Sequence, residues 1–355
     1  DKSNDSLILS VPYSLTSGNV VEYIPNVGVV DDTDSFIYKA NDGVNDSSVA
    51  LVSLNILPWF PPIGIPIPGF GITESHIMYD DVAYTYDYGG GPEAYKLGSD
   101  GPYTHYVDNT DLNASDLGNP LGTPSVPRLT LPPDPPAGSV IEIHGGPYTG
   151  ADYTITSSGT ALNPIFFRGI AGNDTIIEHK IHIRGSYIIF ENLIFDKNNT
   201  AQEAILIRPG VITDIIEYIS IRNCEFRNYM TDPPGEASLI IVDNALLGDT
   251  NLVQDIVIYS NYIHENNFNF NPLAKQDIHG LAISANVESL WFVDNYSHSN
   301  SGSSVKIMWN GLAPTVPPKL IYIGRNELRD DAEAAIDIKA SSDVIISENL
   351  IHDYN

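Results

Sequence analysis

Two short apolar segments carry most of the residues that could do chemistry. SVKIM (304–308) contains Lys306, AIDIK (335–339) contains Asp337 and Lys339, and His279 directly precedes a third such segment. A lysine that can lose its proton, beside a carboxylate and a second cation, could remove the proton α to the carboxylate of a uronic acid, which begins a β-elimination. Cations or Ca²⁺ would stabilise the enolate-like intermediate. We therefore expect Lys306 or Lys339 to be the base. Asp337 would be a metal ligand or tune the base, and His279 would assist as an acid.

Further residues are candidates for binding. We expect Arg208 to contact substrate, and Trp309, which follows SVKIM by one residue, to form a platform for a sugar ring. Asp330, Asp331 and Glu333 crowd into one predicted turn. They could supply oxygen ligands for Ca²⁺, with Asp330 and Asp331 the expected ligands. They could also supply the pair of carboxylates, about 5–10 Å apart, that a glycoside hydrolase uses.

The elements that position these residues are repeated. Six segments of the second half share a run of β-branched residues, an asparagine and a further apolar pair. They are IIFENLIF (188–195), ISIRNCEF (219–226), IVIYSNYI (256–263), WFVDNYSH (291–298), IYIGRNEL (321–328) and VIISENLI (344–351). A recurrent unit of this length, without helical periodicity between copies, is typical of a β-solenoid.

The asparagines of these segments predict an internal column of amides. Four of them, Asn192, Asn261, Asn326 and Asn349, have an isoleucine three residues before and isoleucine or leucine two residues after. Asparagine at a bend between apolar side chains can bond the backbone of its own turn and the amide of the next coil. We interpret these asparagines as structural.

A second set of strands follows the asparagine turns and carries the candidate site. The segments are AILIR (204–208), SLIIVD (238–243), GLAIS (280–284), SVKIM (304–308) and AIDIK (335–339). Strand alternation predicts two outward columns: Leu206, Ile240, Ala282, Lys306 and Asp337, and Arg208, Val242, Ser284, Met308 and Lys339. Lys306 would then lie beside Asp337. The alternative to a catalytic site is a cross-strand ion pair worth under ~1 kcal/mol.

The first coils resemble those of right-handed parallel β-helix polysaccharide lyases, particularly the chondroitinase B and alginate lyase group. The matching stretches are a glycine-rich turn at Gly145–Gly150, GTALNPI at Gly159–Ile165 and GSYIIF at Gly185–Phe190. The resemblance implies an all-β, right-handed parallel β-helix of the pectate lyase-like superfamily. In these lyases the base lysine follows a metal-binding glutamate by several residues. Asp337 and Lys339 are only two apart, so the catalytic pattern itself is not matched.

The chain before the solenoid divides into three predicted parts. Residues 1–57 resemble an immunoglobulin-like, cadherin-like β-sandwich module, through EYIPN (22–26), DSFIY (34–38) and the Asn-Asp-Gly turn at 41–43. Residues 58–71 form a proline- and glycine-rich linker. Residues 72–135 form an irregular lead-in and cap, and residues 136–355 the β-helix. We expect the β-helix to continue beyond residue 355 or to stack on a partner.

Composition limits the class of function. A formal net charge of −28 opposes binding of nucleic acid and of anionic membranes. No apolar run approaches the ~18 residues of a membrane span, and no phosphate loop or other signature of an organic cofactor occurs. Two readings stay open for an extracellular or cell-surface protein. It could be an enzyme acting on a polysaccharide, or a non-catalytic adhesin, sheath or filament subunit whose partners are other copies of itself or cell-surface components.

Overall fold

The protein is described by a computed structural model in which the chain divides into two compact units after Trp59. The structure describes residues 32–38, 47 and 50–56 of the first unit. Of the second it describes residues 64–72, 74, 103–169, 175–198, 203–210, 215–229, 236–243, 252–266, 277–308 and 316–354. These residues contain no helix, and hence none that is long and apolar enough to cross a membrane.

The first unit contains one described pair of strands. β1 (Asp32–Tyr38) runs antiparallel to β2 (Ala50–Ile56), with Asp32 opposite Ile56 and Tyr38 opposite Ala50. The pair agrees with the predicted hairpin pattern around the Asn-Asp-Gly turn. The immunoglobulin-like form of residues 1–57 stays a prediction, because most of that stretch lies outside the described residues.

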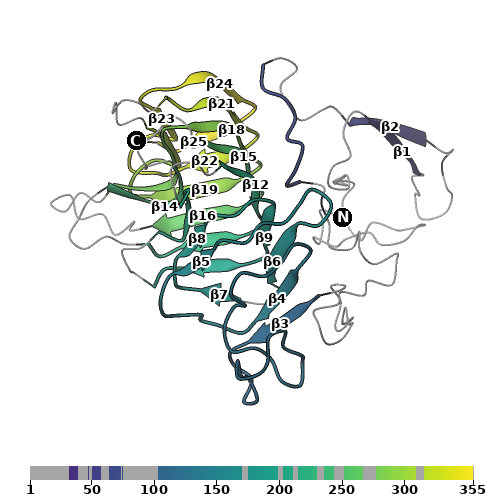
Figure 1. The fold of residues 1–355 in the computed structure, drawn as a ribbon. Helices are drawn as coiled ribbons and strands as arrows, with labels where there is room; N and C mark the ends of the chain where they lie inside the picture. The colour runs from purple at the N-terminus through teal and green to yellow at the C-terminus, as the bar shows by residue number, and fades with distance from the viewer. Residues whose placement is uncertain are drawn as a thin grey trace. The chain divides into compact units, whose positions relative to one another are not determined.

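The second unit is a stack of parallel strands in three sheets (Figure 1). The nine-stranded sheet contains, in spatial order, β24 (Ser342–Ser347), β21 (Lys319–Gly324), β18 (Val287–Val293), β15 (Leu252–Tyr259), β12 (Ile215–Arg222), β9 (Ile188–Glu191), β6 (Ile165–Gly169), β4 (Val140–His144) and β3 (His105–Asp108). The β7–β25 sheet contains β25 (Leu350–His352), β22 (Glu327–Arg329), β19 (Tyr296–Asn300), β16 (Tyr262–Asn266), β13 (Glu225–Arg227), β10 (Ile194–Asp196) and β7 (Ile176–Ile177). The β5–β23 sheet contains β23 (Ile336–Ile338), β20 (Val305–Ile307), β17 (Asp277–Ile283), β14 (Glu236–Val242), β11 (Ile205–Ile207), β8 (Ile181–Ile183) and β5 (Tyr153–Ile155).

Each coil visits the three sheets in turn, so that strands three apart in the chain are neighbours in space. β12, β13 and β14 form one coil, and β15, β16 and β17 lie beside them in the same order. All these ladders are parallel. The topology agrees with the predicted parallel β-helix.

The core is a column of stacked apolar side chains. Ile188, Ile219, Ile256 and Leu290 are in register on successive coils and are fully buried. The rings of Phe167 and Phe190 stack with centroids 4.8 Å apart, as do those of Phe195 and Phe226. Burying one such side chain is worth about 1.5–3 kcal/mol, so repetition of the apolar pattern stabilises the whole stack.

A column of amides runs along the corner between the nine-stranded and β7–β25 sheets. The backbone N–H of Asn261 donates to Oδ1 of Asn295 (2.9 Å), that of Asn295 to Oδ1 of Asn326 (2.8 Å), and that of Asn326 to Oδ1 of Asn349 (2.9 Å). Each side-chain Nδ2 also donates to a carbonyl of the preceding coil, as Asn295 does to Ile258 (3.0 Å). We call these four residues the first amide ladder.

The sequence frame for this ladder was wrong for Asn192 and omitted Asn295. Asn192 and Asn223 occupy the preceding corner position, where the backbone φ is +57° and +51°. Later coils have Ser260, Asp294, Arg325 and Glu348 there, also at positive φ. The ladder position itself holds Leu193 and Cys224 in the two earlier coils, and Cys224 N–H donates to Asn261 Oδ1 (3.0 Å). One residue of offset thus separates the two groups of asparagines.

A second amide ladder lies at the end of the β7–β25 sheet. Asn266 Nδ2 donates to Asn300 Oδ1 (2.8 Å), and Asn300 donates to Asp331 Oδ1 from its backbone N–H (3.0 Å) and from Nδ2 (2.9 Å). Its members follow Asn261, Asn295 and Asn326 by five residues. Because this ladder fixes the turns that lead into the β5–β23 sheet, it supports the region of the candidate site.

The outer face of the nine-stranded sheet is covered. Residues 64–72, most of which fall in the predicted linker, lie along it. Trp291 Nε1 donates to the carbonyl of Pro66 (3.0 Å), and Ser220 Oγ donates to that of Gly71 (2.6 Å). Phe70 is buried beside Ile189. Residues 64–72 thus cover part of the nine-stranded sheet, whereas the predicted site residues His279, Lys306 and Asp337 belong to the β5–β23 sheet.

Candidate functional site

The predicted outward column through Lys306 needs one correction. In the β5–β23 sheet Leu206 pairs with Ile241, Ile241 with Ala282, Ala282 with Lys306, and Lys306 with Asp337. Ile241 replaces the predicted Ile240, and Arg208 lies beside Asp243 where Val242 was expected. The shift arises because Leu239 and Ile240 are both core residues, so this strand turns a corner and breaks simple alternation.

The same corner places His279 on the outer side. Ile278 and Leu281 both lie in the core although they are three residues apart. The turn falls at Gly280, where an added Cβ would come within 2.7 Å of the Ser304 carbonyl. His279 and Asp277 precede this corner inside β17, whose start at Asp277 is earlier than the predicted segment 280–284.

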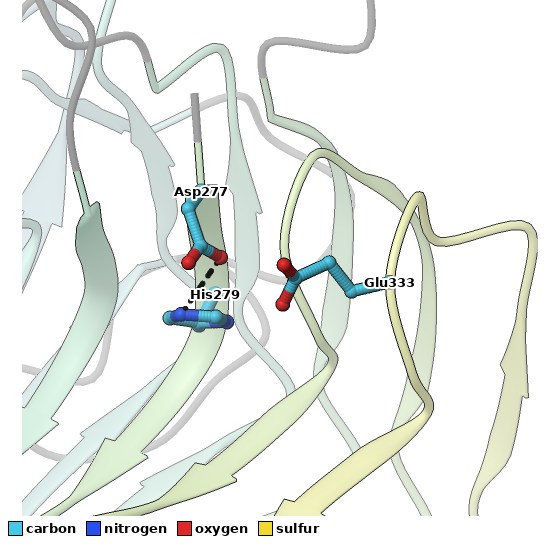
Figure 2. Close-up of side chains that lie close together, drawn as sticks. All are labelled: Asp277, His279 and Glu333. Atoms are coloured by element: carbon cyan, nitrogen blue, oxygen red, sulfur yellow. Dashed lines mark ion pairs between the residues drawn. The ribbon is translucent and has the colours of Figure 1, made fainter. Parts of the chain in front are cut away.

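Asp277, His279, Lys306 and Glu333, which come from three successive coils, lie close together on the outer side of the β5–β23 sheet. Figure 2 shows Asp277, His279 and Glu333. His279 Nε2 lies 3.0 Å from Asp277 Oδ1 and 3.0 Å from Lys306 Nζ. Lys306 Nζ lies 3.6 Å from Asp277 Oδ2. Ligand atoms of Asp277, His279 and Glu333 all lie within 4.8 Å of one another. The His279 side chain is fully buried, that of Lys306 is 7% exposed and that of Asp277 is 29% exposed.

A backbone hydrogen bond determines the hydrogen position on the imidazole. The N–H of Ser303 donates to His279 Nδ1 (2.8 Å), so Nδ1 carries no hydrogen and the uncharged ring has its hydrogen on Nε2. Lys306 Nζ lies in hydrogen-bonding geometry to Nε2. Asp277 Oδ1 is buried, and no donor of the described residues lies in such geometry to it, although His279 Nε2 is 3.0 Å away.

This arrangement accommodates Lys306 in two protonation states. An amine nitrogen accepts a hydrogen bond only when it is uncharged, so the Nε2–H of His279 favours the free amine. The ammonium form instead pairs with the Asp277 carboxylate. In the observed side-chain position Lys306 Nζ thus has a partner within 3.6 Å for either protonation state.

The two carboxylates of the cluster respond in opposite ways. Burial acts to raise the pKa of Asp277, but His279 and the charge of Lys306 outweigh it and lower that pKa. Burial and the negative charge of Asp277 raise the pKa of Glu333. At neutral pH Asp277 is thus the more firmly ionised of the two, and its Oδ2 lies 3.6 Å from Lys306 Nζ.

At Gly302 the backbone packs directly against the cluster. A Cβ added at Gly302 would lie 2.6 Å from both Asp277 Oδ1 and His279 Nδ1. Ser304 Oγ donates to Asp331 Oδ2 (2.5 Å), and Tyr354 OH donates to the same oxygen (2.9 Å). The second amide ladder, which ends at Asp331, is thereby bonded to the residue that precedes β20 and Lys306.

Two other predicted site residues, Arg208 and Lys339, form ion pairs outside this cluster. Arg208 forms a bidentate pair with Asp243, at 2.6 Å from each nitrogen. Lys339 Nζ, 59% exposed, pairs with Asp337 Oδ2 at 2.7 Å. Trp309 lies outside the described residues.

Asp330, Asp331 and Asp337, the three aspartates expected to bind metal, each have a different hydrogen-bond or ion-pair partner in the structure. Asp331 is buried and accepts hydrogen bonds on both oxygens, and burial raises its pKa. Asp330 is near Arg329 at 3.9 Å, and Asp337 pairs with Lys339. Among the described residues, the only group of three or more potential ligands within such a distance is Asp277, His279 and Glu333, which is compatible with one metal ion.

Sequence reasoning missed Asp277 and Ser303. Asp277 and His279 are two residues apart, as on one face of a strand, but the strand was expected to begin only at Gly280. The contribution of Ser303 is a backbone N–H, for which the residue type gives no signal.

No protein-family model matches the sequence, and no curated protein matches it. The class that fold and topology define is a parallel β-helix, an architecture compatible with both carbohydrate-active enzymes and structural rods.

Proposed function

We propose that this protein is an extracellular carbohydrate-active β-helix protein that cleaves a uronic-acid glycan by β-elimination, with Lys306 as the base. The observation that carries the proposal is the orientation of Lys306 by His279, whose Nε2–H is directed at Nζ by the Ser303 N–H on the opposite ring nitrogen. A base held by an orienting group that is itself fixed is the general pattern of an activated catalytic side chain.

The reaction follows from the two states of Lys306. The free amine takes the proton from the carbon α to the substrate carboxylate, and the electron pair of that C–H bond forms the new double bond. The bond from the β carbon to the glycosidic oxygen breaks, and the oxygen leaves with a proton returned by the Lys306 ammonium. Asp277, 3.6 Å from Nζ, stabilises the ammonium between these two transfers.

In this proposal His279 is a positioning residue. Its side chain is fully buried, so it acts on Lys306 and does not touch the glycan. The role differs from that of assisting acid, which requires contact with the leaving oxygen. Lys339, which is exposed, and Ca²⁺ from the medium are the cations that offset the charge of the substrate on this acidic protein.

The test is the ultraviolet absorbance of the unsaturated uronate product, measured over a panel of uronic-acid polysaccharides with Ca²⁺ present. We expect Lys306→Met to lower the rate by about 10²–10⁴-fold, the usual contribution of a general base. Lys339→Met should weaken substrate binding and leave turnover near that of the original protein. Lys319→Met, which removes a surface ion pair with Glu288 on another sheet, is the matched control.

The second candidate is a non-catalytic rod, adhesin or filament subunit. The observation that favours it is the pairing of outward charges on the β5–β23 sheet, Arg208 with Asp243 and Lys339 with Asp337. Absence of product from every polysaccharide, together with ordered multimers in electron micrographs, would decide for the rod. Equal activity of Lys306→Met and the unmodified protein would remove Lys306 from the mechanism.

A further inference from the structure

The Lys306 amine lies within a set of metal-ligand atoms. His279 Nε2 is 3.0 Å from Nζ, Asp277 Oδ2 is 3.6 Å from it, and the ligand atoms of Asp277, His279 and Glu333 are within 4.8 Å of one another. Ligands of one metal ion at about 2.1 Å, set at right angles, are themselves about 3 Å apart. The separation of 3.0 Å between Asp277 Oδ1 and His279 Nε2 has this value.

One oxygen of the cluster is buried without a hydrogen-bond donor. Asp277 Oδ1 is shielded from solvent, and no N–H or O–H of the described residues reaches it in hydrogen-bonding geometry. An ionised oxygen in this condition has lost its hydration without replacement. A cation between this oxygen and Nε2 would replace it.

The types of ligand indicate which cation is suitable. One imidazole nitrogen and two carboxylates form a set that Zn²⁺, Co²⁺ and similar first-row ions accept. Ca²⁺ prefers oxygen ligands only, so a site containing His279 discriminates against it. The outward turn at Glu333 is exposed, which gives an ion access from solvent.

We propose that Asp277, His279 and Glu333 form a binding site for a divalent first-row transition-metal ion, and that the ion and the Lys306 ammonium compete for it. Two cations at a separation near 3 Å repel each other strongly in a partly buried site. Binding through Nε2 also requires the ring hydrogen on Nδ1, which breaks the hydrogen bond from Ser303. Both costs keep the affinity of the unmodified protein low.

The proposal does not rest on the lyase reaction, because binding is measured without glycan. If both proposals hold, the metal ion inhibits the lyase by displacing its base. If only the metal site exists, Co²⁺ binds and no polysaccharide is cleaved. The two failures are therefore distinguishable.

The experiment is a titration of the full chain with Co²⁺, followed by the visible absorption of the bound ion and by calorimetry. A large excess of Ca²⁺ occupies the many surface carboxylates. Lys306→Met, which keeps the side-chain length and removes the charge, should bind Co²⁺ at least tenfold more tightly than the original protein. Lys306→Gln provides a second test of the same charge should the methionine variant not fold.

Ligand substitutions and a surface control complete the test. In the Lys306→Met background, Asp277→Asn and His279→Gln should each weaken Co²⁺ binding at least tenfold, and the His279 change should alter the visible spectrum. Lys319→Met should bind like the original protein. Equal Co²⁺ affinity of the original protein and both Lys306 variants would overturn the competition. Binding unaffected by Asp277→Asn would overturn the site.

Discussion

The first amide ladder and the Asp277–His279–Lys306–Glu333 cluster both consist of polar side chains on neighbouring coils. They differ in how completely these polar groups are hydrogen-bonded. In the ladder both atoms of every side-chain amide are bonded to the preceding coil, as Asn295 accepts from the Asn261 N–H and donates to the Ile258 carbonyl. In the cluster, no donor of the described residues reaches one buried oxygen of Asp277, and Lys306 Nζ lies 3.0 Å from the neighbouring His279 Nε2. A fully paired column stabilises the fold, whereas an incompletely paired one retains the capacity to exchange protons or ions.

The largest effect on stability is expected when one asparagine of the first amide ladder is removed. Asn295→Ala leaves the backbone N–H of Asn261 and the carbonyl of Ile258 buried without partners. We expect a loss of about 3 kcal/mol in the free energy of unfolding, measured by chemical denaturation.

The matched control is Asn223→Ala. This asparagine is exposed and occupies the corner position at φ +51°, outside the ladder. Only the cost of an alanine at positive φ applies, which is about 1 kcal/mol. Equal losses in the two variants would contradict the distinction between ladder and corner asparagines.

A substitution in the Asp277–His279–Lys306–Glu333 cluster should instead affect activity. His279→Gln removes the Nε2–H that orients Lys306, and loss of such an orienting partner lowers activity by about 10–100-fold. Because His279 does not reach the substrate, kcat should fall with KM nearly unchanged. A fall in thermal stability as large as that of Asn295→Ala, with kcat per folded molecule unchanged, would show that His279 is only structural.

The smallest effect is expected where neighbouring coils carry like charges. Burial and the charges of Glu217 and Glu288 raise the pKa of Asp255 to about 6. The folded protein therefore binds a proton more readily than the unfolded chain, and ionisation of Asp255 destabilises the fold as the pH rises through about 6.

Asp255→Asn should accordingly stabilise the protein at pH values above about 6. The gain should be under about 1 kcal/mol, because the group is partly exposed and screened by solvent. It should disappear as the pH falls towards the ordinary pKa of an aspartate. Asparagine suits the backbone there, at φ +54°. Denaturation at a series of pH values measures the effect, and a gain independent of pH would contradict it.

Repetition made the coil predictable from sequence. The six apolar segments carry the same side chains to the same place in successive turns, and the neighbour relation of Lys306 and Asp337 followed from their alignment. The first amide ladder was visible but misframed at Asn192, because two coils have leucine and cysteine at the ladder position. The second ladder could have been found from the recurrence of Asn or Asp five residues after Asn261, Asn295 and Asn326.

The candidate site was only partly predictable, because its geometry depends on features that do not repeat. The corner at Gly280 shifts Asp277 and His279 to the outer side, and nothing in the alternation of β17 signals it. The hydrogen position on His279 depends on the backbone of Ser303, whose residue type is irrelevant. Lys306 and His279 could thus be named from sequence, but not the contacts that distinguish them from Lys339 and Asp337.

The regular offset of five residues between the two ladders has a consequence for engineering. A copied segment from Asn295 to the residue before Asn326 would bring its own pair of amides, Asn295 and Asn300, in the spacing that both neighbours require. Splicing such a copy into the chain should lengthen the protein by one step of about 4.8 Å. The copy would also carry a second Lys306 and would move Glu333 one coil further from Asp277 and His279, so lengthening the scaffold at this point would dismantle the three-ligand group.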